Sequence, residues 1–531
     1  MPVTLAPAAS NAIRTAELPD RLAGLLAARA ARHPAAPALH EGGRDIGYGE
    51  LWQAVQETAG QLAGLGVRPG DRLLVVGENS LAQVCLVFAA GLCDAWFVCV
   101  NARLTAPEVD AIARHCGARR AFYTDGVSPE AAAHGARHGA RHLPASALVG
   151  RWLAGPLDAD AQPEPVHADG ARQCAALLYT SGTTGRPKGV MLSHRSLLYV
   201  AAVSATLRRL APQDRAAGVL PLSHVYGLAS VLLGTLHAGA CLHLVPRFTP
   251  AGLLRMLAHD GITILQGVPA LYARLLEAAA GGPVASRLRF LYAGGSPLAP
   301  ALKARVEAAF GLPLHNGYGM TETAPTISQT RVDVPRADAS VGYPIPGIET
   351  RIDAALGELW VRGPNVMLGY YRDAAQTAAV LRPDGWLNTG DVVRQDAGGA
   401  LFIVGRTKEL IVRAGFNVYP LEVETLLNAH PRVVQSAVVG RPVADGDEQV
   451  IAFVEARSDG NCGDSATSGN DDALAGELSV YLAGQLAPYK LPARIVLLAA
   501  LPAAASGKVL KGALRELALG LPAPASRAPA S

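Results

Sequence analysis

Residues 179–190 read YTSGTTGRPKGV, a run of hydroxyl-bearing residues and glycines that follows an apolar segment and precedes a helical pattern. Such a loop can present backbone N–H groups, hydroxyls and the Lys188 ammonium to phosphate oxygens, while its glycines let the phosphate approach closely. The P-loop pattern does not fit, because Pro187 precedes Lys188 and Gly189 follows it. We therefore predict a phosphate-binding loop of another kind, placed between a strand and a helix.

On both sides of this loop, from Leu73 to about Gly363, short β-rich runs alternate with helical patterns. Such alternation indicates parallel or mixed sheets covered by helices on both faces. After Gly405 the expected elements become shorter, which indicates a separate small unit. We predict an α/β fold with a large N-terminal domain of mixed and parallel sheets flanked by helices, and a smaller mobile α+β C-terminal domain. The expected boundaries are 1–405, 406–515 and a disordered tail, 516–531.

The overall composition is that of a globular enzyme. Half of the 531 residues are apolar, 17% are charged and the net charge is +3, which argues against a disordered chain and against a nucleic-acid-binding polyelectrolyte. The start lacks a basic segment followed by an apolar one, so no secretory signal is expected. The seven cysteines are scattered without a CxxC pair, which favours buried thiols in a reducing cytoplasm over disulfides or a zinc site.

Two segments have a local composition that needs interpretation. The stretch from Leu81 to Val100 is apolar enough to imitate a membrane span, but Gln83 and Asp94 interrupt it. We expect a core helix followed by a buried strand there, and no integral membrane segment. The polar segment 457–472 has no periodicity and is expected to form a surface loop.

Lysine is rare in this chain, with six lysines against forty-one arginines. Each lysine is therefore informative, since lysine suits a place that requires a compact, mobile ammonium instead of a planar guanidinium. Four of the six lie in glycine-rich or turn-like motifs: Lys188, Lys408, Lys508 and Lys511. Lys303 is expected to be an ordinary charge on a helix surface.

The 179–190 loop resembles the phosphate-binding signature of the adenylate-forming superfamily, which comprises acyl-CoA synthetases, peptide-synthetase adenylation domains and beetle luciferases. Further segments of the chain are similar to that superfamily's motifs and occur in the expected order. They are PLSHVYG (221–227), GVPALY (267–272), AGGSP (293–297), NGYGMTET (316–323), GWLNTGD (385–391), GRTKELIVRAGFNVYP (405–420) and LPAAASGKVLK (501–511). The resemblance spans about 40–515 and implies an AMP-forming acid–thiol ligase of the acyl-CoA synthetase type.

The chemistry implied by this resemblance has two steps. A carboxylate first attacks the α-phosphate of ATP, which releases pyrophosphate and forms an acyl-adenylate; a thiol then displaces AMP. Two anions must meet in the first step, so cations, oriented dipoles and Mg²⁺ lower its barrier. The large domain would bind ATP and the acyl group.

The resemblance assigns the phosphates and the metal to two segments. The β- and γ-phosphates would be held by Thr180, Ser181, Gly182, Thr183, Thr184 and Gly185 together with Lys188. Glu322 and Thr184 would hold Mg²⁺, with Thr321 beside them at the α-phosphate. The expected catalytic residues are Lys508, Glu322, Thr184 and Lys188.

The adenosine part of ATP would lie between two further motifs. By resemblance, adenine is sandwiched between Gly294, Gly295, Ser296 and Pro297 on one side and Asn316, Gly317 and Tyr318 on the other. Asp391 would accept hydrogen bonds from both ribose hydroxyls, with Arg406 nearby.

The small domain would take part in both steps. Lys508 would bridge the substrate carboxylate and the α-phosphate during adenylation, and Lys408 would sit at the hinge about which the small domain swings. The thiol tunnel would then be lined by Gly415. Arg247 matches a position that contacts a CoA phosphate in related ligases, the alternative being an exposed arginine after a strand. Val412 stands where some relatives have a second lysine for CoA.

The acyl pocket would be lined by small, aromatic or apolar residues: His224, Val225, Tyr226, Gly227, Gly267, Gly294 and Gly319. Amino-acid-activating relatives place an aspartate in the 221–227 segment, and its absence here argues against an α-amino acid, whose ammonium would be buried unpaired. The pocket fits an uncharged aromatic or a medium- or long-chain aliphatic acid. His224 could be a gate or a wall residue.

Coenzyme A is the first choice of acceptor, because the chain has no carrier-protein segment after Lys511. Two alternatives remain open. One is an adenylating enzyme that loads a separate carrier protein, and the other is a catalytically silent nucleotide-binding relative. We expect a cytoplasmic monomer or homodimer whose partners are a small carboxylic acid, ATP and CoA, with no nucleic acid.

Overall fold

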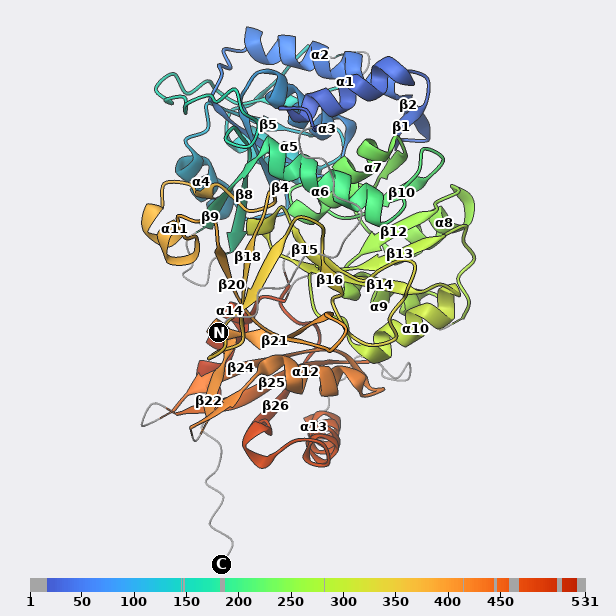
Figure 1. Cartoon of the computed structure of the whole chain (residues 1–531), viewed down its shortest axis with the longest axis vertical. Helices are drawn as coiled ribbons and strands as arrows, with labels where there is room; N and C mark the ends of the chain where they lie inside the picture. Colours follow the sequence, from blue (N-terminus) through green and yellow to red (C-terminus); the bar gives the residue numbers. More distant parts are fainter. Residues whose placement is uncertain are drawn as a thin grey trace, which may run out of the picture.

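The computed structural model describes residues 17–144, 146, 149–181, 187–280, 282–413, 415–443, 447–457, 468–503 and 509–522. It has the predicted α/β fold, with a large N-terminal part built on three sheets and a smaller α+β part at the C-terminal end (Figure 1). The small part, coloured orange to red, lies below the large part in Figure 1.

The phosphate-loop candidate belongs to a mixed eight-stranded sheet. Its central strands run parallel to their neighbours, and antiparallel pairs extend the sheet at both ends. In spatial order the strands are β19 (Gly369–Tyr370), β9 (Pro187–Ser193), β8 (Cys174–Ser181), β4 (Trp96–Asn101), β3 (Arg72–Gly77), β5 (Arg120–Tyr123), β7 (Leu153–Ala154) and β6 (Arg141–His142).

A nine-stranded sheet carries the second half of the large part. Its strands β14, β13, β12, β10, β11 and β1 are successive parallel neighbours. In spatial order the sheet consists of β16 (Tyr343–Pro344), β15 (Thr326–Gln329), β14 (Leu314–Gly319), β13 (Phe290–Ala293), β12 (Ile264–Gly267), β10 (Arg215–Gly218), β11 (Cys241–Leu244), β1 (Pro37–Glu41) and β2 (Arg44–Gly47).

Helices cover both sheets, and one continuous apolar core joins them. They are α1 (Leu22–Arg32), α2 (Tyr48–Gly64), α3 (Leu81–Leu92), α4 (Ala106–Cys116), α5 (Pro129–Arg137), α6 (His194–Leu207), the π-helix η2 (Tyr226–Leu233), α7 (Gly234–Ala238), α8 (Pro250–His259), α9 (Pro269–Ala278), α10 (Pro300–Phe310) and α11 (Ala374–Val380). A four-stranded antiparallel sheet follows, made of β17 (Glu349–Ile352), β18 (Glu358–Arg362), β20 (Leu387–Gln395) and β21 (Leu401–Arg406).

The apolar stretch between Leu81 and Val100 forms the expected helix and strand, α3 and β4. The Ser80 side chain caps α3 by accepting a hydrogen bond from the Gln83 N–H. Every residue of α3 from Leu81 to Gly91 is buried, because α1, α2, β3 and β4 pack around it. No described helix has the length and apolar character needed to span a bilayer.

The small part has a sheet whose two faces are both covered by helices of the same part. Its elements are β22 (Ile411–Arg413), β23 (Phe416–Val418), α12 (Pro420–Ala429), β24 (Val433–Pro442), β25 (Glu448–Ala456), α13 (Ser468–Ala483), η6 (Pro488–Lys490), β26 (Arg494–Leu498) and α14 (Lys511–Leu519). Val438 on β24 packs with α12 and α13, whereas the neighbouring Val439 packs with α14. This alternation is the period of two that a strand buried on both faces requires.

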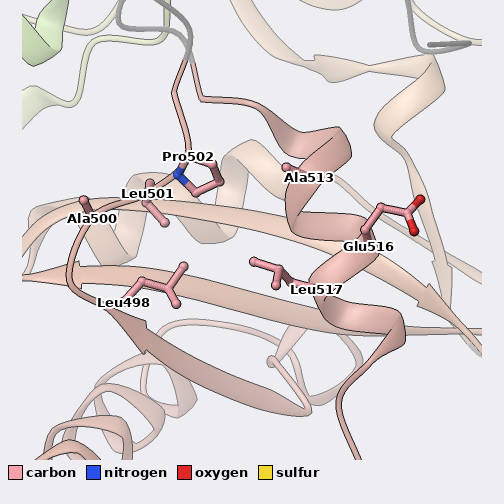
Figure 2. Close-up of a pocket in the computed structure, with 7 residues that line it drawn as sticks. All are labelled: Leu498, Ala500, Leu501, Pro502, Ala513, Glu516 and Leu517. Carbon is pink, nitrogen blue, oxygen red and sulfur yellow. The ribbon is translucent and has the colours of Figure 1, made fainter. Parts of the chain in front are cut away.

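An open apolar hollow lies between α14 and the chain that follows β26 (Figure 2). Its lining residues are Leu498, Ala500, Leu501, Pro502, Ala513, Glu516 and Leu517. None of the described residues that we expect at the active site lines it.

Four expectations are wrong. Residues 187–193 form strand β9, not the end of a loop, since Val190 and Leu192 are buried in an antiparallel pairing with β8. Helix α13 begins at Ser468, inside the segment expected to be a loop. Helix α14 continues to Leu519, beyond the expected start of the tail, because Leu514 and Ala518 are buried.

The fourth concerns Lys303, which is 2% exposed and not a surface charge. Its ammonium donates to the Leu314 carbonyl oxygen (2.9 Å) and to Glu307 one helical turn away. Six cysteines are described, Cys85, Cys93, Cys99, Cys116, Cys174 and Cys241; all are free and all but Cys93 are buried, as expected.

Candidate active site

The residues expected in the acyl pocket meet at one edge of the nine-stranded sheet. Strands β10, β12, β13 and β14 are parallel neighbours, so their carboxyl ends lie along the same edge. Gly267 ends β12, Gly294 follows β13, Gly319 ends β14, and the segment 224–227 follows β10. This is the edge at which open α/β sheets bind ligands.

Two glycines at this edge are required because backbone oxygen atoms lie where a side chain would begin. A Cβ atom built on Gly319 would lie 1.8 Å from the Pro325 carbonyl oxygen, and one on Gly227 would lie 2.2 Å from the Pro221 carbonyl oxygen. A Cβ on Gly294 would instead make ordinary contacts, 3.4 Å from the rings of Tyr226 and Tyr292. Gly294 is therefore the position where a side chain would narrow the pocket without displacing the backbone.

His224 and Val225 lie at the turn before η2. The His224 Nδ1 atom accepts a hydrogen bond from the Tyr226 N–H (3.2 Å). Val225 is buried, at 2% exposed. Both residues shape the chain that enters the pocket.

The phosphate loop is anchored by the ladder between β8 and β9. Thr180 pairs with Lys188, and Ser181 pairs with Pro187. Gly182, Thr183, Thr184 and Gly185 lie outside the described residues. The ladder places Thr180 and the half-buried Lys188 on adjacent strands at the base of this loop.

Lys188 and Glu322 both contact the same tyrosine, Tyr370. The Lys188 ammonium lies 5.4 Å from the ring centroid of Tyr370, a cation–π contact, and the Tyr370 hydroxyl donates to Glu322 Oε1 (2.8 Å). Glu322 is 8% exposed and begins no helix of its own; it lies in the short 3₁₀ turn η3 (Thr321–Thr323). Burial and the Glu322 carboxylate raise the pKa of Tyr370, so this hydroxyl stays a donor.

A second cluster, at the expected ribose position, links the four-stranded sheet to the nine-stranded sheet. Asp391 on β20 is 1% exposed; its Oδ2 accepts from the Tyr318 hydroxyl (2.5 Å) and its Oδ1 from Arg406 Nε (2.7 Å). Asp391 and Arg406 face each other in register on β20 and β21. The Asp391 charge raises the pKa of Arg406, and burial raises the pKa of Tyr318. Three expected nucleotide-binding residues are thus brought together.

The two segments expected to flank adenine differ in their exposure to solvent. Gly295 and Pro297 are exposed and Ser296 is partly exposed. Asn316 is buried, and its amide donates to the Ser340 carbonyl oxygen (3.1 Å) and accepts from the Gly317 N–H (3.0 Å). The Asn316 side chain therefore positions the end of β14. Its amide donor and its amide acceptor are both already hydrogen-bonded to the backbone.

Arg247 is compensated by two carboxylates. Its Nη2 donates to Glu130 Oε1 (2.7 Å) and lies 3.5 Å from Glu78 Oε1, which also pairs with Arg103 Nε (3.1 Å). The Arg247 side chain is nevertheless 48% exposed. It lies at the surface with its charge already paired.

The expected hinge lies in the turn η4 (Thr407–Glu409). The Thr407 hydroxyl donates to Glu358 on β18 (2.5 Å), and Lys408 is exposed. The Lys511 ammonium bridges Glu409 (2.6 Å) in this turn to Glu424 (2.8 Å) on α12. These contacts connect the turn to the sheet on one side and to the small part on the other.

Two further expected residues belong to the small part. Gly415, in the turn between β22 and β23, has φ +77° and no described atom within 4 Å of a Cβ built on it. Lys508 lies outside the described residues. Arg413, which precedes this turn, donates to the carbonyl oxygens of Tyr489 (3.2 Å) and Leu491 (2.5 Å).

Sequence reasoning missed Tyr370 and a buried group around Arg208. Tyr370 stands in the run Gly369-Tyr370-Tyr371, and this aromatic pair after a glycine was the available signal. Arg208 gave no signal, because an arginine after a helix is ordinarily a surface charge.

Comparison with known proteins identifies the family to which the chain belongs. The sequence model of the family described as AMP-binding enzyme matches residues 26–371, and that of the AMP-binding enzyme C-terminal domain matches residues 422–508. The chain is 36% identical over 506 residues to a feruloyl-CoA synthase of Amycolatopsis, covering 92% of this chain and 97% of that protein. It is 33% identical over 513 residues to an indoleacetate–CoA ligase of Aromatoleum aromaticum, covering 94% and 97%.

Solved structures agree with the fold. ATP-bound MatB of Rhodopseudomonas palustris superposes with a TM-score of 0.79 at 30% identity, covering 94% of this chain and 99% of that one. A benzoate CoA ligase of Burkholderia xenovorans superposes with a TM-score of 0.79 at 26% identity, covering 93% and 99%.

Proposed function

Because this chain belongs to the AMP-binding enzyme family and is an AMP-forming acid–CoA ligase, we propose that it activates an aromatic carboxylic acid at the sheet edge described above. The observation that carries the proposal is that Lys188 and Glu322 both contact Tyr370, one at the ring face and the other at the hydroxyl. A cation and a buried carboxylate that share one tyrosine suit a polyphosphate and its metal ion. The rings of Tyr226 and Tyr292 beside Gly294 suit a flat acyl group.

The donor set fits Mg²⁺ held jointly with ATP. The described residues contain no group of three or more acidic, histidine or cysteine side chains that could hold a metal alone. Mg²⁺ typically takes one or two carboxylates and completes its shell with phosphate oxygens and water. Glu322, whose Oε1 is oriented by Tyr370, would supply that carboxylate, and Thr184 a hydroxyl. When bound, the metal would neutralise charge on the phosphates during adenylation.

The adenosine would be held at Asp391. Ribose hydroxyls are donors, and a carboxylate accepts from two of them. Arg406 and Tyr318 orient this carboxylate from two directions. Gly294–Pro297 and Asn316–Tyr318 would flank the adenine, with Asn316 acting through the backbone that it fixes.

The small part, from residue 406 onward, would serve both steps. In the first, Lys508 would bridge the acid carboxylate and the α-phosphate. A rotation about Lys408 would then remove Lys508 and present the Gly415 turn, along which the thiol of CoA would enter. The contacts of Thr407 with Glu358 and of Lys511 with Glu409 support a turn that is anchored on both sides.

CoA is proposed as the acceptor on the strength of the relatives named above. One further relative, 32% identical, is a fatty acid–[acyl-carrier-protein] ligase of Streptomyces coeruleorubidus, so a carrier protein is the competing acceptor. We place the enzyme in the cytoplasm, because its six described cysteines are free thiols, and we propose a monomer or homodimer.

The test is acid-dependent AMP release. The purified full chain is incubated with ATP, Mg²⁺ and a panel of aromatic and aliphatic acids, with either CoA or a phosphopantetheinylated carrier protein. We expect AMP release and acyl-CoA formation with aromatic acids and CoA. Thioester formation with the carrier alone, or a preference for aliphatic acids, would overturn the proposal.

A further inference from the structure

Arg208 is a buried cation that stacks on Tyr292, one of the two rings beside Gly294 in the expected acyl pocket. It caps the C-terminal end of α6 and is 1% exposed. Its guanidinium lies over the ring of Tyr292, with Cζ 4.0 Å from the centroid, and donates to the side-chain oxygens of Gln266 and Gln329 (3.3 Å to Gln329). No carboxylate pairs with Arg208 among the described residues. A buried charge without an opposite charge is costly to maintain.

Arg72 shows how this chain satisfies a buried arginine structurally. Arg72 is 0% exposed and also lacks a carboxylate, but its guanidinium donates to four main-chain carbonyl oxygens. Arg208 has two amide oxygens and an aromatic face. The two environments differ in how many of the five N–H donors they satisfy.

The side chains around Arg208 have polar atoms without partners. Gln266 Nε2, Tyr226 Oη and Ser230 Oγ are buried and make no hydrogen bond with the described residues. Their residues are 1%, 5% and 0% exposed. An unsatisfied buried polar group costs about 1–3 kcal/mol. Gln266 contacts Arg208 and Tyr226 contacts Tyr292, so their two unsatisfied atoms beside this cation indicate a ligand that pairs with them.

These atoms belong to the pocket that the glycines define. Gln266 precedes Gly267 on β12 and pairs in register with Tyr292 on β13. The rings of Tyr226 and Tyr292 lie 6.2 Å apart, edge to face, and both contact the position of a Cβ on Gly294. Burial raises the pKa of Tyr226, so its hydroxyl is a donor at neutral pH. Arginine and the glutamine amide group are donors too.

We propose that the acid carries a hydrogen-bond acceptor oxygen at the end remote from its reacting carboxyl group, and that Arg208, Gln266 and Tyr226 bind this oxygen. An anionic oxygen, as in a second carboxylate, fits best because it also compensates the Arg208 charge. The inference rests on the proposed function, since it assigns the far end of the same pocket. It differs from the expectation of an uncharged acyl group.

The first experiment compares matched acids. The full chain is assayed for acyl-CoA formation with 3-phenylpropenoic acids that carry methyl, hydroxyl or carboxylate at the ring position opposite the side chain. We expect kcat/KM to rise from methyl to hydroxyl to carboxylate, by about tenfold or more between the extremes, because a site built to hydrogen-bond rejects the analogue that lacks the group. Equal values, or a preference for methyl, would overturn the inference.

The second experiment uses a matched pair of variants. Tyr226→Phe removes a hydroxyl that makes no hydrogen bond within the described part of the chain, whereas Tyr272→Phe removes one that lies 3.1 and 3.0 Å from the carbonyl oxygens of Leu265 and Tyr292. We expect Tyr226→Phe to lower the carboxylate-to-methyl ratio of kcat/KM without loss of thermal stability. Tyr272→Phe should lower the melting temperature and leave that ratio unchanged. A ratio that is unchanged in Tyr226→Phe contradicts the proposed contact.

Failure of this inference is distinguishable from failure of the proposed function. If the three acids are all converted to acyl-CoA at equal rates, the ligase assignment holds and only the recognition at Arg208 is wrong. If no aromatic acid gives AMP release, the proposed function itself is wrong.

Discussion

The hydroxyl of Tyr370 lies 2.8 Å from Oε1 of Glu322 and donates to it. This bond fixes the orientation of a buried carboxylate at the expected metal position, and the same ring faces the Lys188 ammonium. Tyr370 is therefore a positioning residue for two groups that belong to different elements, Lys188 on β9 and Glu322 in η3. Its role can be tested without touching either of them.

Tyr370→Phe should raise KM for MgATP and lower the rate of acyl-adenylate formation by about tenfold, since a hydrogen bond to a charged group contributes about 1.5–3 kcal/mol. The measurement is acid-dependent pyrophosphate release at varied Mg²⁺. Tyr371→Phe is the matched control, because that hydroxyl bonds to Glu164 (2.5 Å). Excess Mg²⁺ should partly restore Tyr370→Phe, and no response to Mg²⁺ would contradict the role.

Gly294→Ala should narrow the acyl pocket while the protein still folds. The new Cβ would lie 3.4 Å from the rings of Tyr226 and Tyr292, an ordinary contact. We expect KM to rise for acids with a substituted ring and to change little for short aliphatic acids. Gly319→Ala should instead prevent folding, because its Cβ would lie 1.8 Å from a backbone oxygen. Equal expression of folded Gly294→Ala and Gly319→Ala would show that the space beside these two glycines is not as described.

Lys508→Ala should abolish acyl-adenylate formation from acid and ATP, yet spare thioester formation from a supplied acyl-adenylate. The reason is that its ammonium is needed only where two anions approach each other. Both half-reactions are measured separately on the same preparation. An equal loss in the two assays would refute the assignment.

Lys511→Met should destabilise the small part by about 2–4 kcal/mol, since it removes the ammonium that pairs with both Glu409 and the buried Glu424. Lys490→Met is the control: it breaks a more exposed pair with Glu422 and should cost less than about 1 kcal/mol. Denaturant unfolding monitors both variants. A similar cost for the two would show that Lys511 is an ordinary surface pair.

Asp214→Asn should reveal an acid-sensitive contribution to stability. Burial alone raises the pKa of Asp214, but hydrogen bonds from Arg289, the Ala211 N–H and the Thr263 hydroxyl outweigh it and lower that pKa. The stabilisation is thus present above the unfolded pKa, near 4, and is lost as pH falls through the folded value.

We expect this variant to cost about 2–3 kcal/mol at pH 7, and the difference from the wild type to shrink below about pH 4. Urea unfolding at several pH values measures it. The surface pair of Asp333 with Arg331 supplies the control, since Asp333→Asn should be nearly neutral throughout. A gap that stays constant with pH would contradict the assignment.

The parts of the fold that sequence could predict are those with local signals. Short β-rich runs alternating with helical patterns predicted the two large sheets, and the shorter elements expected after Gly405 include the strands β24, β25 and β26. Strand β9 escaped because its pairing with β8, not its own composition, makes it a strand. Contiguous motifs likewise predicted that Thr180, Glu322 and Asp391 bind parts of the same nucleotide.

Contacts between distant residues could not be predicted. Lys303 is buried because the Leu314 carbonyl oxygen and Glu307 together satisfy its ammonium, and only the packing of α10 against β14 brings these groups within reach. Arg208 depends in the same way on Gln266, Tyr292 and Gln329, which come from three different strands. Residue statistics place such cations at the surface, so their burial becomes visible only in three dimensions.

Asp391 and Arg406 stand opposite each other on β20 and β21, and η4 begins with the next residue, Thr407. If the small part turns at η4, the pivot lies beside the nucleotide, whereas α13 lies at the end of the small part away from the large part (Figure 1). A modest rotation would then sweep the distal surface through a wide arc while the ribose carboxylate stays almost stationary. Such an arrangement allows the acyl-adenylate to remain seated while everything beyond it changes place.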